Sequence, residues 1–371
     1  MKKRLLAQVI LFLFFLTVII IIGVIFLYNY KKINNKEITE KTKEILISEP
    51  VINPSTLIWE QITPSALFEG RDSQAVVVYK NKIWLMGGVN GSTRLIYPGN
   101  VDYGNAPHFN DVWSSEDGVN WQLVLNKAPW GKRRSMQAVN FKGKIFLMGG
   151  WGPEIGLKND VWSSEDGIKW KLETSSARWE SREGHQVVVY KNKIWLMGGV
   201  KYNSHKLFND VWSSEDGVNW KKEADNASWS PRWDHAIVGF NNKLWVIGGM
   251  DLKGNVYKDI WSSEDGANWF LVDDNPPFLS RQGFAMLDYQ NKIWVIGRLN
   301  TSEYGNGTND IWYSKDGVIW EKTKEDPLWT GREDFGAVIF KNKMWILGGM
   351  DKNWEWKNDV WRSKSDIVLK K

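Results

Sequence analysis

Short apolar runs alternate with polar turns along most of the chain, and this pattern favours β-strands. In residues 182–223 an apolar run at 185–190 is followed by a Lys-Asn-Lys turn and a second run at 194–197, which two glycines end. A third run covers 210–213, an Asp-Gly pair marks another turn, and Trp220 begins a fourth run. Short runs bounded by turn residues are typical of antiparallel strands. The segment therefore predicts a four-stranded unit.

This unit occurs six times. A Gly-Gly pair ends the second run in five copies, and Gly297-Arg298 stands in its place in the remaining copy. A tryptophan in the third run recurs 49 to 51 residues apart, at Trp113, Trp162, Trp212, Trp261, Trp312 and Trp361. No unit buries both of its faces alone, whereas units stacked around an axis do. The repeat therefore predicts an all-β fold, a six-bladed β-propeller of four-stranded antiparallel blades.

The two ends of the repeat complement each other. The last copy contains Trp361 but has no tryptophan for a fourth strand, and residues 58–62 before the first copy resemble that missing strand, with Trp59 in the matching place. Exposed sheet edges promote association between chains. We therefore expect the N-terminal strand to complete the last blade and close the ring.

The apolar strand, the Gly-Gly pair, the spaced Arg and the late Trp resemble the kelch-repeat propellers, the fold of the galactose-oxidase central domain. The turn at 114–121, Ser-Ser-Glu-Asp-Gly-Val-Asn-Trp, also resembles the Asp box of sialidase-like propellers. The resemblance covers residues 57–371 and concerns structural motifs. Galactose oxidase chemistry requires a cysteine, and this chain has none.

The N-terminal segment has a different pattern. Leu5 to Leu27 is an uncharged stretch of 23 residues, long enough for a helix that crosses a bilayer. We expect residues 1–30 to form a cytoplasmic tip and a signal anchor, residues 31–56 a polar stalk, and residues 57–371 the propeller. Lysines flank the apolar stretch on both sides, so their count does not fix the orientation. Reading the segment as an export signal predicts a single-pass protein of the cell membrane with an extracytoplasmic propeller.

Charge and composition exclude several functions. The formal net charge is +5, of which +4 lies in residues 1–56, so the propeller lacks the basic surplus of a nucleic-acid binder. Without cysteine there is no thiol nucleophile and no Cys-ligated zinc. His185 and His235 occupy equivalent places in adjacent copies but have no third ligand at a suitable spacing. We therefore predict no metal and no cofactor.

Two sets of residues are candidates for ligand binding. One is an arginine that recurs 16 residues before each glycine pair, in a position to form an anion-binding mouth or to bond neighbouring loops. Its copies are Arg71, Arg133, Arg182, Arg232, Arg281 and Arg332. The other set consists of tryptophans outside the repeat pattern, in loops that emerge on the same face as the arginines, where indoles stack on sugars, anchor a protein or cover the blades. These are Trp151, Trp233, Trp354 and Trp356.

These features favour a non-catalytic binding propeller that recognises a glycan or a protein through the Arg/Trp face and contacts the lipid bilayer through residues 5–27. The alternative is a carbohydrate enzyme, because some bacterial kelch propellers resemble sialic-acid mutarotases. Glu183 or Glu333 would then carry the proton. A purely structural envelope role is a third interpretation. The loop from Val89 to Phe109, about a dozen residues longer than its counterparts, is a candidate specificity element or a peripheral ornament.

Overall fold

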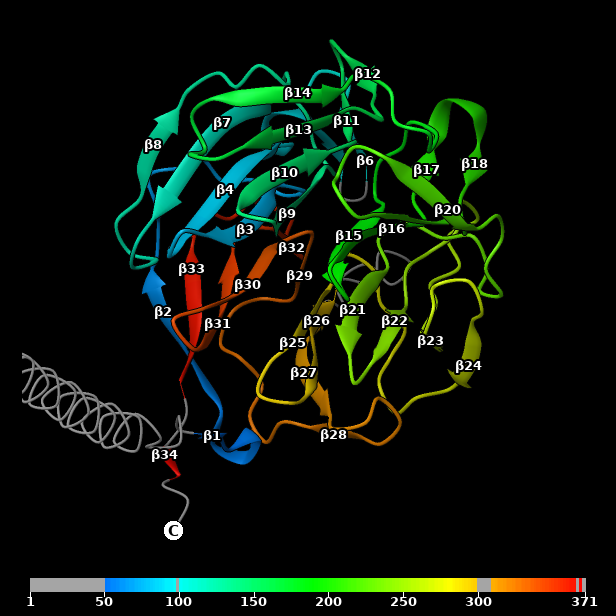
Figure 1. The fold of residues 1–371 in the computed structure, drawn as a ribbon. Coiled ribbons are helices and arrows are strands. Elements are labelled where there is room, and N and C mark those ends of the chain that lie inside the picture. Colours follow the sequence, from blue (N-terminus) through cyan, green and yellow to red (C-terminus); the bar gives the residue numbers. More distant parts are fainter. Residues whose placement is uncertain (1–50, 98–99, 299–307, 365–366, 369–371) are drawn as a thin grey trace, which may run out of the picture. The chain divides into compact units, whose positions relative to one another are not determined.

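The computed structural model describes residues 51–97, 100–298, 308–364 and 367–368. Within these ranges the strands form six four-stranded antiparallel sheets arranged as the blades of a propeller (Figure 1). The predicted six-bladed, all-β fold is therefore confirmed.

The blades follow one another along the chain. Blade 1 consists of β3 (Ala75–Tyr79), β4 (Lys82–Val89), β7 (His108–Ser115) and β8 (Gln122–Leu125). Blade 2 consists of β9 (Gln137–Phe141), β10 (Lys144–Met148), β13 (Val161–Ser164) and β14 (Trp170–Thr174). Blade 3 consists of β15 (Gln186–Tyr190), β16 (Lys193–Met197), β19 (Val211–Ser214) and β20 (Trp220–Ala224). Blade 4 consists of β21 (Ala236–Phe240), β22 (Lys243–Ile247), β23 (Ile260–Ser263) and β24 (Phe270–Asp273). Blade 5 consists of β25 (Ala285–Asp288), β26 (Ile293–Arg298), β27 (Thr308–Ser314) and β28 (Trp320–Lys322). Blade 6 consists of β30 (Gly336–Phe340), β31 (Lys343–Leu347), β33 (Val360–Lys364) and β2 (Ile58–Thr63).

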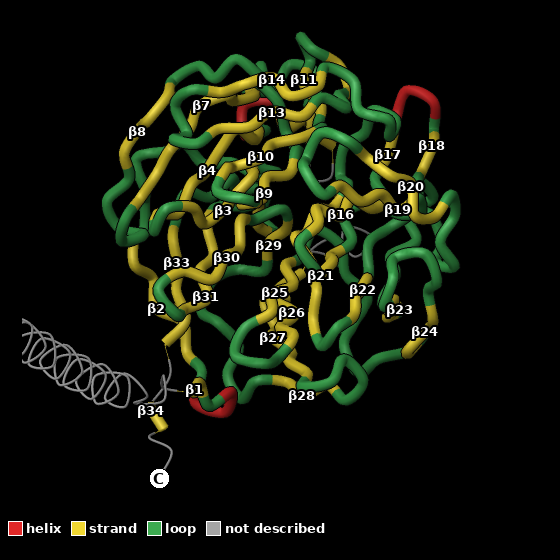
Figure 2. The backbone as a smooth tube through the Cα atoms, viewed as in Figure 1, coloured by secondary structure: helices red, strands yellow, loops and turns green. Residues whose placement is uncertain are grey.

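Short elements decorate the connections between the blade strands (Figure 2). The two-stranded pairs are β5 (Leu95–Tyr97) with β6 (Asn100–Val101), β11 (Trp151–Gly152) with β12 (Gly156–Leu157), β17 (Val200–Lys201) with β18 (Lys206–Leu207), and β29 (Arg332–Glu333) with β32 (Met350–Asp351). The 3-10 helices are η1 (Pro54–Thr56), η2 (Ser92–Arg94) and η3 (Tyr202–Ser204). In a separate unit, β1 (Val51–Ile52) pairs with β34 (Ile367–Val368).

The described part of the chain holds no helix that is both long and apolar enough to cross a bilayer. The predicted anchor at residues 5–27 and most of the predicted stalk lie outside the described residues.

The seam of the ring lies in blade 6, where the first and last parts of the propeller pair. β2 runs antiparallel to β33, with Ile58 opposite Lys364 and Trp59 opposite Ser363 (Figure 1). Trp59 is only 5% exposed, and its ring packs edge-on against Trp329 with the ring centroids 4.6 Å apart. This is the closure that the sequence predicts.

Backbone angles and local hydrogen bonds explain why the same residue types recur in the turns. Lys191 and Asn192, which join β15 to β16, have φ angles of 47° and 56°, as a two-residue type I′ hairpin requires. In the turn before β20, the hydroxyl of Ser214 accepts a hydrogen bond from the Gly217 amide at 2.8 Å. The carboxylate of Asp216 accepts bonds from the amides of Val218 and Asn219 at 2.8 and 2.7 Å.

The tryptophans of the second strands connect successive blades. Trp84 of β4 lies against Gly167 of blade 2, where an added Cβ would come within 2.1 Å of the indole. The same core cluster joins Met86 of blade 1 to Ile145 and Leu147 of blade 2, all three completely buried. Such contacts between blades account for much of the unusual tryptophan content, since each blade buries its faces on its neighbours.

Candidate functional site

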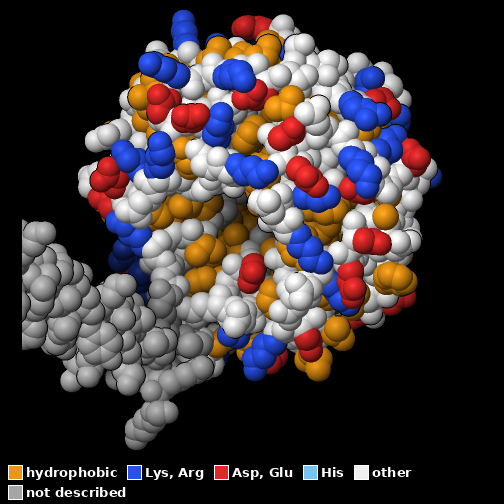
Figure 3. Space-filling model, viewed as in Figure 1, with side chains coloured by type: hydrophobic (Ala, Val, Ile, Leu, Met, Phe, Trp, Pro, Cys, Tyr) orange, Lys and Arg blue, Asp and Glu red, His pale blue; other side chains and the backbone are white. Residues whose placement is uncertain are grey.

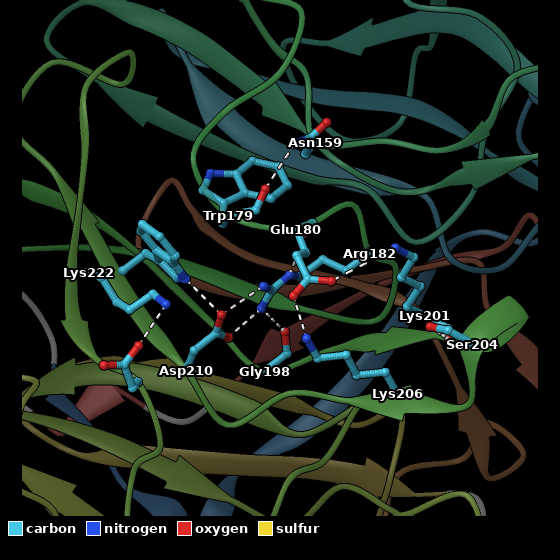
Figure 4. A network of polar contacts seen from close by, with 12 residues as sticks. Asn159, Trp179, Glu180, Arg182, Gly198, Lys201, Ser204, Lys206, Asp210 and Lys222 are labelled. Atoms are coloured by element: carbon cyan, nitrogen blue, oxygen red, sulfur yellow. Dashed lines mark hydrogen bonds and ion pairs between the residues drawn. The ribbon is translucent and has the colours of Figure 1, made fainter.

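The six recurring arginines lie inside the blades. Figure 4 shows Arg182 with both terminal nitrogens on the carboxylate of Asp210, at 2.5 and 2.8 Å. Its guanidinium also donates to the carbonyls of Gly198 and Glu180, each at 2.9 Å. The equivalent ion pairs are Arg71–Asp111, Arg133–Asp160, Arg182–Asp210, Arg232–Asp259, Arg281–Asp310 and Arg332–Asp359.

This burial corrects the expectation that these guanidiniums form an open anion-binding mouth. No more than 1% of any of the six arginines is exposed. A buried guanidinium requires a charged partner, and the aspartate that precedes each third-strand Val/Ile-Trp pair supplies it. The arginines therefore bond the strands and loops of their own blades, as the alternative interpretation held.

The residues that follow each arginine meet at the axis of the ring. Backbone hydrogen bonds connect neighbouring blades there, from Ser135 to Ser73 at 2.8 Å, from Ser73 to Asp334 at 2.9 Å and from Asp334 to Gly283 at 2.8 Å. They continue from Gly283 to Asp234 at 3.0 Å and from Asp234 to Gly184 at 3.1 Å. This collar of backbone bonds brings the side chains of different blades together. We call the region around the collar residues the axial mouth; these residues are Ser73, Ser135, Gly184, Asp234, Gly283 and Asp334.

Five carboxyl groups and one guanidinium gather in the axial mouth. The acidic residues are Asp72, Glu183, Asp234, Glu333 and Asp334, and the basic residue is Arg134. All five acidic residues are buried or half-buried, and Ser73 donates to Asp334 at 3.1 Å. The position after the recurring arginine thus varies between blades and is polar in five of the six, in contrast to the uniform strands.

Burial and mutual repulsion raise the pKa of these carboxyl groups. Burial, together with the charge of Asp334, raises the pKa of Asp72 to about 7. The same two causes raise the pKa of Glu183, and for Asp234 and Glu333 they raise it well above the usual range. The guanidinium of Arg134 opposes the shift at Asp72, Glu183 and Asp334 but does not outweigh burial. Asp72 therefore retains its proton up to about neutral pH, and the same physical causes favour the protonated form of its neighbours.

Arg134 is the central cation of the mouth. Its Nε lies 3.2 Å from a carboxylate oxygen of Glu183. Its guanidinium carbon lies 4.1 Å from the ring centre of Tyr103 and 5.4 Å from that of Trp151. The aromatic rings and the carboxylate hold the guanidinium in place, because a cation is attracted to a ring face as well as to an anion.

A pocket of about 290 Å³ opens beside this group. It is lined by Arg134, Trp151, Gly156, Leu157, Glu183, Tyr202 and Asn203. The pocket combines two aromatic rings with one cation and one carboxyl group, a combination suited to a small polar ligand with an apolar face. A second cavity of about 230 Å³ follows the axis below the mouth, where Gln74, Asp234 and Asp334 lie on its wall. Figure 3 shows a hollow at the centre of the ring with hydrophobic side chains around it.

The four loop tryptophans occupy different environments. Trp151 is half-buried in the pocket, and Trp233 packs edge-on against Tyr202 with centroids 5.4 Å apart. Trp356 is buried, and its indole nitrogen donates to Asp72 at 2.8 Å, which connects blade 6 to the mouth. Trp354 packs beside Trp356 in a small cluster with Met350.

The long loop after β4 covers part of the same region. Its residues Val101 and Tyr103 pack against Trp356, and Tyr103 faces Arg134. Residues 98–99 of this loop lie outside the described part of the chain. The described part therefore contributes to the wall of the mouth.

Both predicted proton carriers, Glu183 and Glu333, lie in the axial mouth. Glu183 faces Arg134, and Glu333 accepts a hydrogen bond from Gln282 at 3.2 Å. His185 and His235 are buried beside Trp179 and Trp229, where burial lowers the pKa of His185 to about 3. Within the described ranges, no three His, Cys, Asp or Glu side chains are placed to hold a metal ion.

No sequence pattern identifies Arg134 or Tyr202 as a residue of the site. Arg134 directly follows a recurring arginine, and its significance is visible only when the six copies are aligned at that position, where it is the one basic residue. Tyr202 lies in η3, in the connection between the second and third strands of blade 3, where no residue type recurs between the copies, so no repeat pattern marks it.

No protein-family model and no curated protein matches this chain. Among solved structures it is similar to one described as the structure of YjhT, with a TM-score of 0.61 and 16% sequence identity. The similarity covers 81% of this chain and 96% of that chain. At this identity the comparison shows the propeller fold alone.

Proposed function

We propose that this protein is a membrane-anchored binding propeller whose axial mouth recognises a carbohydrate, with residues 5–27 in the bilayer and the propeller outside the cytoplasm. The observation that carries the proposal is the pocket in which Trp151 and Tyr202 flank Arg134 and Glu183. Aromatic faces pack on the apolar side of a sugar ring, while charged groups bind its hydroxyls.

The size of the pocket favours a sugar over a protein ligand. A volume of about 290 Å³ suits one or two sugar rings. A stable protein interface buries about 800 Å² on each partner and centres on exposed anchor residues. All four loop tryptophans pack against neighbours within the propeller, and Trp151, which lies edge-on to His108, also lines the pocket. The glycan is therefore the better-supported ligand.

A glycan array probed with the full-length protein tests this proposal. We expect binding that falls about tenfold or more in Trp151→Ala, because the sugar loses its stacking surface. Trp354→Ala is the matched control, since Trp354 lies in the cluster around Met350 and outside the pocket lining. Equal binding by both variants and the wild type would remove the pocket from the proposal.

A second candidate function is acid–base catalysis on the bound sugar. The position of Glu183 on the pocket wall beside Arg134 supports it, and burial raises the pKa of its carboxyl group, which favours the protonated form that donates a proton. In mutarotation, an acid protonates the ring oxygen while a base takes the proton of the anomeric hydroxyl. The bond from the anomeric carbon to the ring oxygen breaks, a carbonyl forms, and the ring closes again on the other face.

Glu183 and Glu333 are the groups we assign to these two proton transfers. The test is anomer exchange of N-acetylneuraminate or glucose in NMR with the full-length protein. We expect Glu183→Gln to abolish acceleration and the exposed-site variant Glu116→Gln to retain it. No acceleration by the wild type would leave the non-catalytic binding role.

A further inference from the structure

The charge balance of the axial mouth points to the chemistry of its ligand. Five carboxyl groups converge on the collar and only one guanidinium faces them, in a propeller whose overall acidic and basic residues nearly balance. Arg134 is already engaged by Glu183. The charge of Arg134 also acts on Asp72, Asp234 and Asp334 but does not outweigh their burial, so a further cation is favoured beside these three carboxyl groups.

The polar atoms left without partners in the mouth are a second, independent observation. Gln74 is 8% exposed, and its side-chain carbonyl lacks a hydrogen-bond partner in the described structure while its amide donates to Leu347 at 3.0 Å. Gln74 lies on the wall of the axial cavity with Asp234 and Asp334. One carboxylate oxygen of Asp72, a residue 2% exposed, also lacks a partner there.

These unpartnered oxygens of Gln74 and Asp72 are hydrogen-bond acceptors. A buried acceptor without a donor is unfavourable, so a ligand that fills this space gains most if it supplies donors. An ammonium group supplies three donors and a positive charge and accepts no hydrogen bond. A sugar carboxylate supplies acceptors only, so it would leave the oxygens of Gln74 and Asp72 without donors.

We propose that the carbohydrate bound in the axial mouth carries a free ammonium group, which Asp72, Asp234 and Asp334 receive. This inference rests on the proposed carbohydrate-binding function and specifies the ligand class as amino sugars that are not N-acetylated. Arg134 stays paired with Glu183 on the pocket side and orients the ring hydroxyls.

Isothermal titration of the full-length protein tests the inference with four sugars: glucosamine, glucose, N-acetylglucosamine and N-acetylneuraminate. We expect glucosamine to bind about tenfold or more tightly than the other three, because charge-assisted hydrogen bonds form with its ammonium alone. Its binding also ionises carboxyl groups, so protons are released and the measured heat differs between phosphate and Tris buffers.

Variants locate the effect. Asp334→Asn keeps the shape of the side chain and is expected to remove most of the preference for glucosamine over glucose, and Asp234→Asn is a second variant of the same kind. Glu116→Gln is the matched control, because that carboxylate is 73% exposed and pairs with Lys82 outside the mouth. Thermal unfolding of each variant shows whether it is folded, and the comparison of sugars on the wild type does not depend on any variant.

The outcomes separate the two proposals. If glucose, N-acetylglucosamine or N-acetylneuraminate binds as tightly as glucosamine, the ammonium assignment is overturned while carbohydrate binding stands. If none of the four sugars binds and the glycan array is also negative, the proposed function itself fails and the inference fails with it.

Discussion

Replacing Trp59 with alanine tests whether the seam between β2 and β33 stabilises the whole ring. Trp59 is 5% exposed and packs edge-on against Trp329 at 4.6 Å. Removing a buried tryptophan costs about 3–5 kcal/mol through lost burial and the cavity left behind. Of this, about 0.5–1.5 kcal/mol comes from the aromatic pair. Such a loss is a large part of the 5–15 kcal/mol that typically stabilises a folded domain.

Ile58→Ala is the matched control for this experiment. Ile58 is the preceding residue of the same strand, pairs with Lys364 and is 48% exposed, so its truncation leaves little cavity. We expect it to change the free energy of unfolding by less than about 1 kcal/mol. Both variants keep the backbone hydrogen bonds of β2, which separates the indole from the strand as a whole.

The assay is urea unfolding of the full-length protein followed by far-UV circular dichroism. We expect one cooperative transition at a clearly lower urea midpoint for Trp59→Ala and a nearly unchanged midpoint for Ile58→Ala. Equal midpoints for the two variants would refute the claim that the seam contributes to ring stability. A transition in which most of the signal keeps the wild-type midpoint would refute cooperation between the seam and the other blades.

Three further predictions concern ion pairs and pH. Asp210→Ala leaves the buried guanidinium of Arg182 without its carboxylate and is expected to lower the free energy of unfolding by about 3–5 kcal/mol. The control Lys221→Ala, at an exposed ion pair, should change it by less than about 1 kcal/mol. Both changes are measured from urea midpoints. Burial opposes ionisation of Asp216, but hydrogen bonds from Asn219 and Val218 outweigh burial and lower the pKa of Asp216 from 3.8 to about 2. The ionised carboxylate therefore stabilises the fold fully above pH 4, and this stabilisation is lost as the pH falls towards 2. In Asp216→Asn we expect the melting temperature to depend less on pH over that interval. The pH dependence due to Asp72 has the opposite sign, because the folded state retains the proton of Asp72 until the pH reaches about 7. Stability therefore declines as the pH rises from 4 to 7. The melting temperature of Asp72→Asn should fall less than that of the wild type over this interval.

The sequence predicted the architecture because the same pattern of strands and turns occurs in six copies. The spacing of the third-strand tryptophans gave the number of blades, and the orphan segment around Trp59 gave the closure. Even the strand ends agree to within a residue or so, as in the predicted run at 194–197 and the observed Lys193–Met197. Type I′ turns and glycines at positive φ have strict residue preferences, which is why these boundaries are visible in the sequence.

The site was less predictable because the residues that recur in every blade are structural, whereas the residues of the axial mouth differ between blades. The arginines recur because each one neutralises an aspartate inside its blade, as Arg182 does with Asp210. Arg134 has no basic counterpart in the other copies, and it meets Glu183 only because the ring brings blades 2 and 3 to a common axis. Charge pairing of this kind depends on side-chain positions in space, and a single sequence contains no direct record of it.

The hydrogen bond between Trp356 and Asp72 joins residues 284 positions apart in the chain. During synthesis the ribosome makes Asp72 long before Trp356, so one wall of the axial mouth is missing until the sixth blade has been translated and folded. The complete axial mouth therefore forms only at the end of synthesis. If the propeller reaches the far side of the membrane as we propose, recognition begins only after translocation is complete.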